Sequence, residues 1–228
     1  MDDWRLIINE LIESDLVKYI LDNQVQPGER LPSLTELSSE IGVSVGKLRE
    51  QLELIRGLGF VSVQPRLGIR RESFDFYPAV CKSLLFGLSS GEASFEQFSL
   101  LRQTIETNMW FEAVSRLTDK DINKLEELVR EAWAKLRDNP VHIPNEEHRE
   151  LHLTLFHRLN NPFVQALLRA YWDAYYLTEL TRFADYQYWI DVWNYHERIV
   201  MAVREDELEC GQRLLVEHFQ TLPTVSGQ

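Results

Sequence analysis

The chain has 228 residues, of which 44% are hydrophobic and 26% charged, and it carries a formal net charge of −12. These values suit a folded protein of one large or two modest domains, and the acidic balance argues at first against a nucleic-acid partner. No run of eighteen apolar residues is present, and the acidic N-terminus lacks the basic region of a signal peptide. We therefore expect a cytoplasmic protein with no membrane partner.

The first part of the chain predicts a helix-turn-helix. Apolar residues at helical spacing predict a first helix over residues 4–23. Ser33 followed by Glu36 is a capping box, which begins a second helix, and Gly42 ends that helix. Ser44 caps a third helix, and a short helix, a tight turn and another helix form a helix-turn-helix.

Two short β-like runs follow, FVSVQ and GIRR, and predict a two-stranded wing. Residues 47–71 carry six lysines and arginines against two glutamates, which makes them the one strongly basic segment of the acidic chain. In a winged helix the last helix of the motif enters the major groove N-terminus first. A winged helix that serves only protein contacts is the alternative. The expected DNA contacts are Ser44, Lys47 and Arg49 in the helix and Arg66 and Arg70 in the wing.

The segment PGERLPSLTELSSEIGVSVGKLREQLELIRGLGFVSVQPRLG resembles the DNA-binding domain of GntR-type bacterial transcription regulators. The pattern of that family is a PGxxLPS turn, an ELA-like helix, GVSRxxVREAL and a PxxG wing. The family often has DNA-contacting arginines where this chain has Thr35 and Val45, whereas Arg49 is kept. The resemblance implies a DNA-binding regulator, with Lys47 as a candidate replacement for the missing arginines.

The rest of the chain predicts an all-helical domain. We expect a winged-helix domain over residues 1–72, a linker over 73–78 and a helical effector-binding domain over 79–228. Short connections between helices favour antiparallel neighbours in a bundle, so the predicted fold class is mostly α. The amphipathic segments run over 75–88, 94–116, 118–137, 145–159, 161–182, 186–204 and 206–220.

Four of the six histidines form a candidate metal site. His148 and His152 are four residues apart and therefore share one face of a helix, whereas His157 points elsewhere. His196 and His218 lie on two successive helices whose antiparallel packing brings both rings to a similar level. Imidazoles that converge from several helices are a common way for a bundle to bind a metal. The alternative is that these histidines are solvated or belong to the core.

The pattern H-x3-H, then Asn-Pro, then H-x21-H is similar to the FCD effector domain of the FadR subgroup of GntR regulators. In that family an aspartate and three histidines bind a divalent metal. The resemblance places His152, His196 and His218 on the histidine positions and His148 on the aspartate position. A site of four nitrogen donors favours zinc or nickel over manganese or magnesium.

The stretch LLRQTIETNMWFEAV resembles the R-x2-[IL]-E helix of the same family, in which an arginine can hold a small carboxylate ligand of the metal. The resemblance implies that Arg102 contacts the effector, because a guanidinium pairs with a carboxylate in two places. The alternative is that Arg102 merely pairs with Glu106 one helical turn away.

The leading hypothesis is a ligand-responsive, homodimeric transcription regulator that binds a palindromic operator, a metal and a small organic acid, and is not an enzyme. One alternative is a metal-dependent hydrolase fused to a helix-turn-helix, for which Glu147 and Glu150 are candidate bases. Another is a metal-free sensor of an apolar or acyl ligand. The aromatic residues that would bind such a ligand are Trp172, Tyr175, Tyr176, Trp189 and Trp193.

Overall fold

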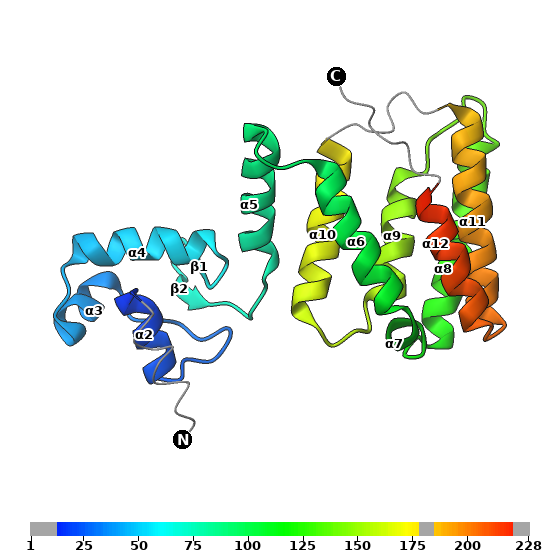
Figure 1. The fold of residues 1–228 in the computed structure, drawn as a ribbon. Helices are drawn as coiled ribbons and strands as arrows, with labels where there is room; N and C mark the ends of the chain where they lie inside the picture. The colour runs from blue at the N-terminus through cyan, green and yellow to red at the C-terminus, as the bar shows by residue number, and fades with distance from the viewer. Residues whose placement is uncertain (1–12, 178–184, 221–228) are drawn as a thin grey trace. The chain divides into compact units, whose positions relative to one another are not determined.

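The computed structural model describes residues 13–177 and 185–220. The chain divides into two compact units, Met1–Ala79 and Val80–Gln228, whose helices and strands are labelled in Figure 1. The predicted fold class is confirmed, because the first unit has a helix-turn-helix with a two-stranded wing and the second is helical. No helix among these described residues combines the length and the apolar character that crossing a membrane requires.

Side-chain caps set the helices of the first unit. Ser33 and Glu36 make both hydrogen bonds of a capping box, and Gly42 ends the same helix with a left-handed φ of 71°. Ser44 accepts a hydrogen bond from a backbone N–H of the next helix, as the sequence predicts. The elements are α2 (Asp15–Asp22), α3 (Leu34–Ile41), α4 (Val45–Gly57), β1 (Val61–Gln64) and β2 (Gly68–Arg71).

The first described helix begins later than the apolar stripe predicts. The stripe favours a helix from residue 4, whereas α2 begins at Asp15 because Ser14 is extended and its side chain caps the helix. The expected turns over residues 4–12 lie outside the described residues. A capping serine inside an apolar stripe thus interrupts the predicted helix.

A small apolar core holds α4 in place. Leu16 of α2, Leu37 of α3 and Leu48 of α4 are fully buried and pack together with the wing. The backbone N–H of Leu31 donates to the carbonyl of Ile69 at 2.9 Å, so the turn before α3 is tied to β2. The core therefore fixes the N-terminal end of α4 relative to the wing.

The second unit is made of longer helices. The predicted segment 94–116 is two helices, because Met109 leaves the helical conformation and lets the buried Trp110 begin a short one. The unit's first helix begins at Tyr77, three residues before the boundary between the units, so the last two residues of the expected linker are helical. The elements are α5 (Tyr77–Ser90), α6 (Phe95–Asn108), α7 (Trp110–Val114), α8 (Asp119–Leu136), α9 (Asn145–Phe156), α10 (Pro162–Leu177), α11 (Tyr186–Arg204) and α12 (Leu208–Gln220).

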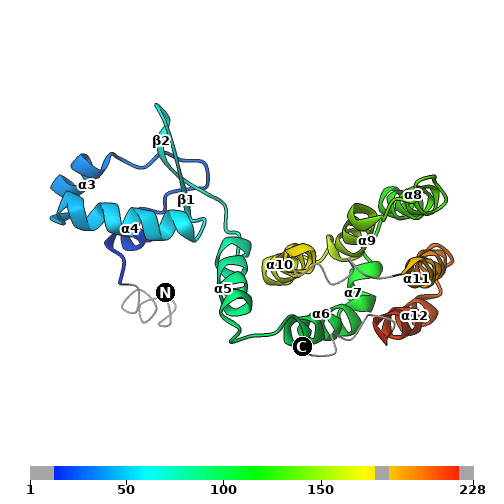
Figure 2. The same cartoon turned by 90° about the horizontal axis from the view of Figure 1, so that it is seen from above.

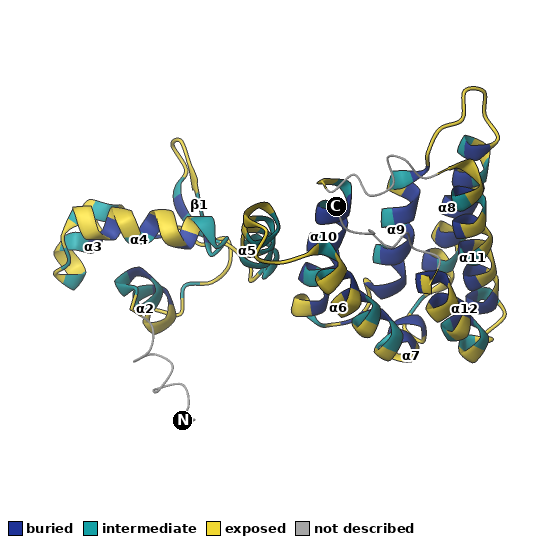
Figure 3. Ribbon diagram, turned by 45° about the horizontal axis from the view of Figure 1, so that its top comes forward, coloured by how far each residue is buried: buried dark blue, intermediate teal, exposed yellow. Residues whose placement is uncertain are grey.

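Six of these helices form a closed ring. In order around it, α6 contacts α10, α10 contacts α9, α9 contacts α8, α8 contacts α11, α11 contacts α12, and α12 returns to α6. Figure 2 views the ring along its helices. Figure 3 shows buried residues on the helices of the ring and none on α5. Side chains that point into the ring are therefore shielded from solvent.

A close approach between α12 and α7 helps to close the ring. Gly211 of α12 lies so near Trp110 that a Cβ atom there would be 2.6 Å from the indole ring. The indole N–H of Trp110 donates to the carbonyl of Leu208 at 2.8 Å. A larger residue at position 211 would push α12 away from this contact.

Candidate metal centre

The four predicted histidines meet inside the ring. His148 and His152 come from α9, His196 from α11 and His218 from α12, and all four are fully buried. One nitrogen from each ring can be chosen so that the four atoms lie within 4.8 Å of one another. The Nε2 atoms of His152 and His196 are 3.2 Å apart. Tetrahedral zinc with Zn–N bonds of 2.0–2.1 Å places its nitrogen ligands about 3.3 Å apart, so this pair already has that spacing, and any wider pair would have to close by up to about 1.5 Å around such an ion.

The protonation of these rings also suits a metal. Burial lowers the pKa of His148, His196 and His218 well below the ordinary value for histidine. Burial lowers the pKa of His152 as well, although the carboxylate of Glu106 opposes that effect. The rings are therefore neutral at neutral pH, which is the form that binds metals.

Several nitrogens of the cluster lack a hydrogen bond. Neither ring nitrogen of His148 has a partner among the described residues, and nor does Nδ1 of His196. Buried polar atoms are nearly always paired, and an unpaired one costs about 1–3 kcal/mol. A cation that accepts the lone pairs of these rings would remove part of that cost.

A carboxylate and a guanidinium border the cluster on the α6 side. Glu106 accepts hydrogen bonds from Arg102 Nε at 2.8 Å and Nη2 at 3.2 Å, and its Oε2 lies 3.0 Å from Nδ1 of His152. Burial would raise the pKa of Glu106, but the charge of Arg102 and the hydrogen bonds with Arg102 and His152 outweigh burial and lower the pKa to about 2. The ionised carboxylate therefore accepts the Nδ1 proton of His152, which leaves Nε2 directed at the other histidines.

Arg102 lies over the ring of His152. Its Nη2 atom is 2.9 Å from Nδ1 and 3.1 Å from Nε2 of that ring. An atom nearly equidistant from both nitrogens sits above the ring face, so the guanidinium takes neither in-plane lone pair. Nη1 of Arg102 has no partner in the described part of the chain. Arg102 therefore pairs with Glu106 and at the same time lies beside the histidine cluster.

Sequence reasoning missed the role of Glu106. It treated the Arg102–Glu106 pair as an alternative to a place in the site, whereas both side chains belong to it. The signal was present, because residues four apart share a helix face, but no spacing rule links α6 to His152, 46 residues further along the chain.

Other candidates lie apart from the cluster. His157 bonds the carbonyl of Thr154 at 2.7 Å and faces Asp121. Glu147 forms a salt bridge with Lys135 at 2.6 Å. Glu150, the other candidate base, pairs with Lys124 and Arg149. These groups are engaged away from the four histidines.

The candidate DNA contacts occupy different local settings. Arg49 is exposed on α4, and Arg66 is exposed at the tip of the wing with a φ of 66°. Lys47 forms a 2.8 Å salt bridge with Asp15 of α2, a partner that sequence reasoning missed. Arg70 donates to the carbonyl of Gly28, and Ser44 caps α4.

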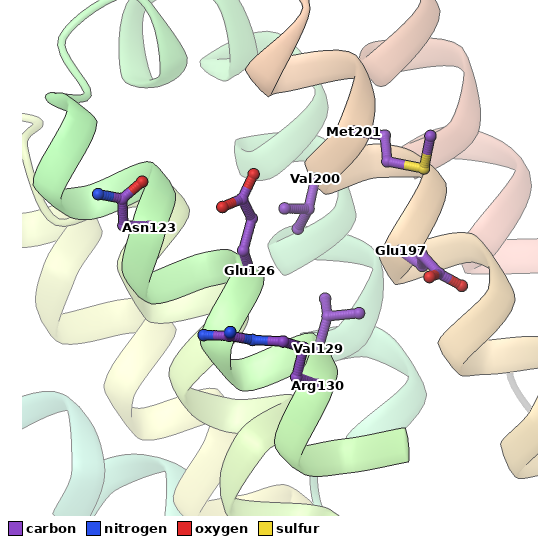
Figure 4. A pocket seen from close by; sticks show the side chains of 7 residues that line it. All are labelled: Asn123, Glu126, Val129, Arg130, Glu197, Val200 and Met201. Carbon is purple, nitrogen blue, oxygen red and sulfur yellow. The ribbon is translucent and has the colours of Figure 1, made fainter. Parts of the chain in front are cut away.

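A groove of about 380 Å³ lies between α8 and α11, away from the histidines. Figure 4 shows side chains of both helices along it. Its Glu126 already pairs with Arg204 at 2.8 Å, and its Glu197 accepts from the indole of Trp133. We assign no ligand to this groove.

Comparisons with known proteins agree with this geometry. The family model described as "FCD domain" matches residues 98–221, more than half of the chain, and "Bacterial regulatory proteins, gntR family" matches residues 9–70. A relative from Edwardsiella tarda, "HTH-type transcriptional repressor NanR", is 26% identical over 98% of this chain and 88% of its own length. Its namesake from Citrobacter rodentium is 23% identical over 96% and 85%. The solved structure "Streptococcus agalactiae GntR" has a TM-score of 0.65 and 20% identity, covering 90% of this chain and 94% of that one.

Proposed function

The chain belongs to the gntR family of bacterial regulatory proteins and carries an FCD domain. From this membership and the histidine cluster, we propose that a small carboxylate effector changes the affinity of the protein for DNA, and that the effector acts through a bound metal ion. The protein is a DNA-binding transcription regulator and not an enzyme. The winged helix is the DNA-binding part, and the ring of helices is the sensor.

The observation that carries this proposal is the buried cluster of four histidines. Four neutral nitrogen donors suit zinc or nickel better than manganese or magnesium, which prefer oxygen. The resemblance to the FCD family places His148 on its aspartate position, and the four proposed protein ligands then add no negative charge to the ion. We propose His148, His152, His196 and His218 as the ligands.

Charge balance supports an anionic effector. Arg102 and Glu106 cancel each other, and the four rings are neutral, so a divalent ion would leave a charge of about +2 inside the ring. Buried charges are usually paired. A carboxylate that binds the metal and the unpaired Nη1 of Arg102 supplies the missing charge.

The DNA-binding proposal rests on α4 and the wing. Arg49 and Arg66 are exposed cations at the end of α4 and the tip of the wing, where phosphates and base edges would lie. Lys47 would also contact DNA once it leaves its salt bridge with Asp15. Ser44 and Arg70 complete the proposed contacts.

We also propose a homodimer on a palindromic operator. A two-fold protein matches a two-fold DNA site. α5 supports this, because its sequence is almost entirely apolar or small, with Lys82 as its one charged residue, and yet none of its side chains is buried. Apolar helices of this kind usually need a partner. The proposed domains are 1–72 and 79–228, with 73–78 as the linker.

The test compares metal-free and zinc-loaded protein on an operator selected from random DNA. Small carboxylates are titrated, and operator binding is followed by fluorescence anisotropy. We expect an acid to change the operator Kd of the zinc-loaded protein and to have a much smaller effect on the metal-free protein. An equal effect on both forms, or no effect of any acid on either, would contradict the proposal.

A further inference from the structure

We propose that the effector carries uncharged oxygen atoms beside its carboxylate, and that the indole N–H groups of Trp172, Trp189 and Trp193 bind them. The effector class is then a hydroxylated carboxylic acid. This inference rests on the proposed function, since it concerns the same sensor site, and it names the residues that select the effector.

Three buried hydrogen-bond donors carry the inference. Trp172, Trp189 and Trp193 are fully buried, and none of their indole Nε1 atoms has an acceptor among the residues that the structure describes. A buried indole N–H usually finds a partner. In the same unit, Trp110 donates to Leu208 and Trp133 to Glu197. Among the tryptophans that the structure describes, the unpaired indole donors are thus those of Trp172, Trp189 and Trp193.

The same three indoles surround one histidine of the cluster. Ring centroids of Trp172, Trp189 and Trp193 lie 4.6, 6.2 and 6.3 Å from that of His148. Trp172 comes from α10, while the other two come from α11, so they approach His148 from two helices of the ring. The three indole rings with unpaired donors therefore lie beside His148, at the proposed metal site.

A metal ion leaves these donors unsatisfied. A cation accepts lone pairs from imidazoles, but an N–H group needs an acceptor. A purely apolar ligand would also leave them unpaired, and an acyl group would offer one carbonyl oxygen to three donors, which disfavours the alternative of a metal-free sensor for such ligands. Oxygen atoms of the effector are the acceptors that meet this need.

The charges of the donors indicate which group of the effector each residue binds. Arg102 lies with its Cζ atom 5.0 Å from the centroid of the Trp172 ring, so the cationic donor and the neutral donors border one region. A guanidinium suits the carboxylate, whereas neutral indole donors suit hydroxyl or carbonyl oxygens. The faces of the indole rings can pack against C–H groups between those oxygens.

Matched pairs of acids test the inference. The probes are glycerate with propionate, threonate with butyrate, and gluconate with hexanoate, which share carbon number and carboxylate and differ in hydroxyl groups. Binding to the zinc-loaded full chain is measured by isothermal titration calorimetry, with zinc content checked afterwards. We expect the hydroxylated acid to bind at least about tenfold more tightly in one or more pairs, because a site built for hydroxyl groups rejects analogues that lack them.

Trp172→Phe, Trp189→Phe and Trp193→Phe each remove one N–H and keep an aromatic ring. Each is expected to weaken the hydroxylated acid by about threefold to tenfold and to leave the matched acid unchanged. Trp133→Phe is the control, because its indole already donates to Glu197 at 3.2 Å. Circular dichroism verifies that each variant is folded before titration.

The inference is overturned if the matched acids bind as tightly as the hydroxylated ones, if no acid binds, or if the variants weaken both acids equally. The last result would mean that the rings act only by packing. An acid that binds in the expected manner but leaves operator affinity unchanged would contradict the proposed function and leave this inference standing. The two failures are therefore distinguishable.

Discussion

Replacing Glu106 with glutamine tests how the α6 side of the site works. The carboxylate is fully buried, accepts two hydrogen bonds from Arg102 and faces Nδ1 of His152. Glutamine has nearly the same shape, keeps one acceptor oxygen and loses the charge. The Glu106→Gln variant therefore leaves Arg102 as a buried cation without a counter-ion.

The expected effects are large and separable. Removing one partner of a buried pair destabilises a protein by about 3–5 kcal/mol. Loss of the acceptor that orients a ligand histidine lowers metal affinity by about tenfold to a hundredfold. The free energy of unfolding is measured by urea titration of the metal-free protein. Zinc affinity is measured by competition with a chromophoric chelator.

A second glutamate provides the matched control. Glu112 pairs with Arg116 at 2.7 Å, also four residues away, but both side chains are about half exposed. Glu112→Gln should cost about 0.3–0.5 kcal/mol and leave zinc affinity unchanged. If Glu106→Gln behaved like this control in both assays, Glu106 would neither support Arg102 nor orient His152, and the reasoning would be refuted.

Three further outcomes are expected. Arg49→Ala should weaken operator binding and flatten its salt slope by about 0.9, whereas Arg56→Ala, at the other end of α4, should leave the slope unchanged in gel-shift titrations. Asp121→Asn should lower the free energy of unfolding by about 1–3 kcal/mol at pH 7. Hydrogen bonds from Arg158 hold the pKa of Asp121 far below its ordinary value. The stabilisation that Asp121 provides is therefore present above about pH 4 and is lost as the pH falls further. An equal acid sensitivity of the variant and the parent in urea titrations would count against this. His148→Asp should retain zinc but raise the affinity for manganese relative to zinc, and an unchanged ratio in metal competition would argue against a ligand role.

Local signals predicted the helices well where one side chain decides a boundary. Ser33 with Glu36, and Ser44 alone, mark the starts of α3 and α4 because caps act within one turn. The apolar stripe predicted a helix that continues through Ser14, whereas Ser14 is extended and caps α2. The general rule is that periodicity indicates an element, while a capping hydrogen bond fixes its end.

The candidate site also has features that the sequence predicts and features that depend on how the helices pack. Spacing alone brings His148 and His152 to one face, and the family pattern adds the histidines of α11 and α12. The orienting contact of Glu106 depends on how α6 closes the ring against α12 and α10, which no spacing along the chain encodes. The charge of Lys47 was read correctly from the sequence, but its pairing with Asp15 depends on the packing of α2 against α4.

The burial of the histidine cluster affects how fast a bound metal ion would exchange, and not only how tightly it would bind. All four rings are sealed from solvent by the helices that supply them, so an ion held there can leave only when part of the ring opens. Local opening of a packed helical unit is rare, and its frequency follows the free energy of that opening. Metal exchange would then be governed by the motions of the protein and would lag behind changes in the surrounding metal concentration. A regulator built this way would keep its ion as a lasting part of its structure, and an acid that binds beside the ion would enter and leave through the same opening.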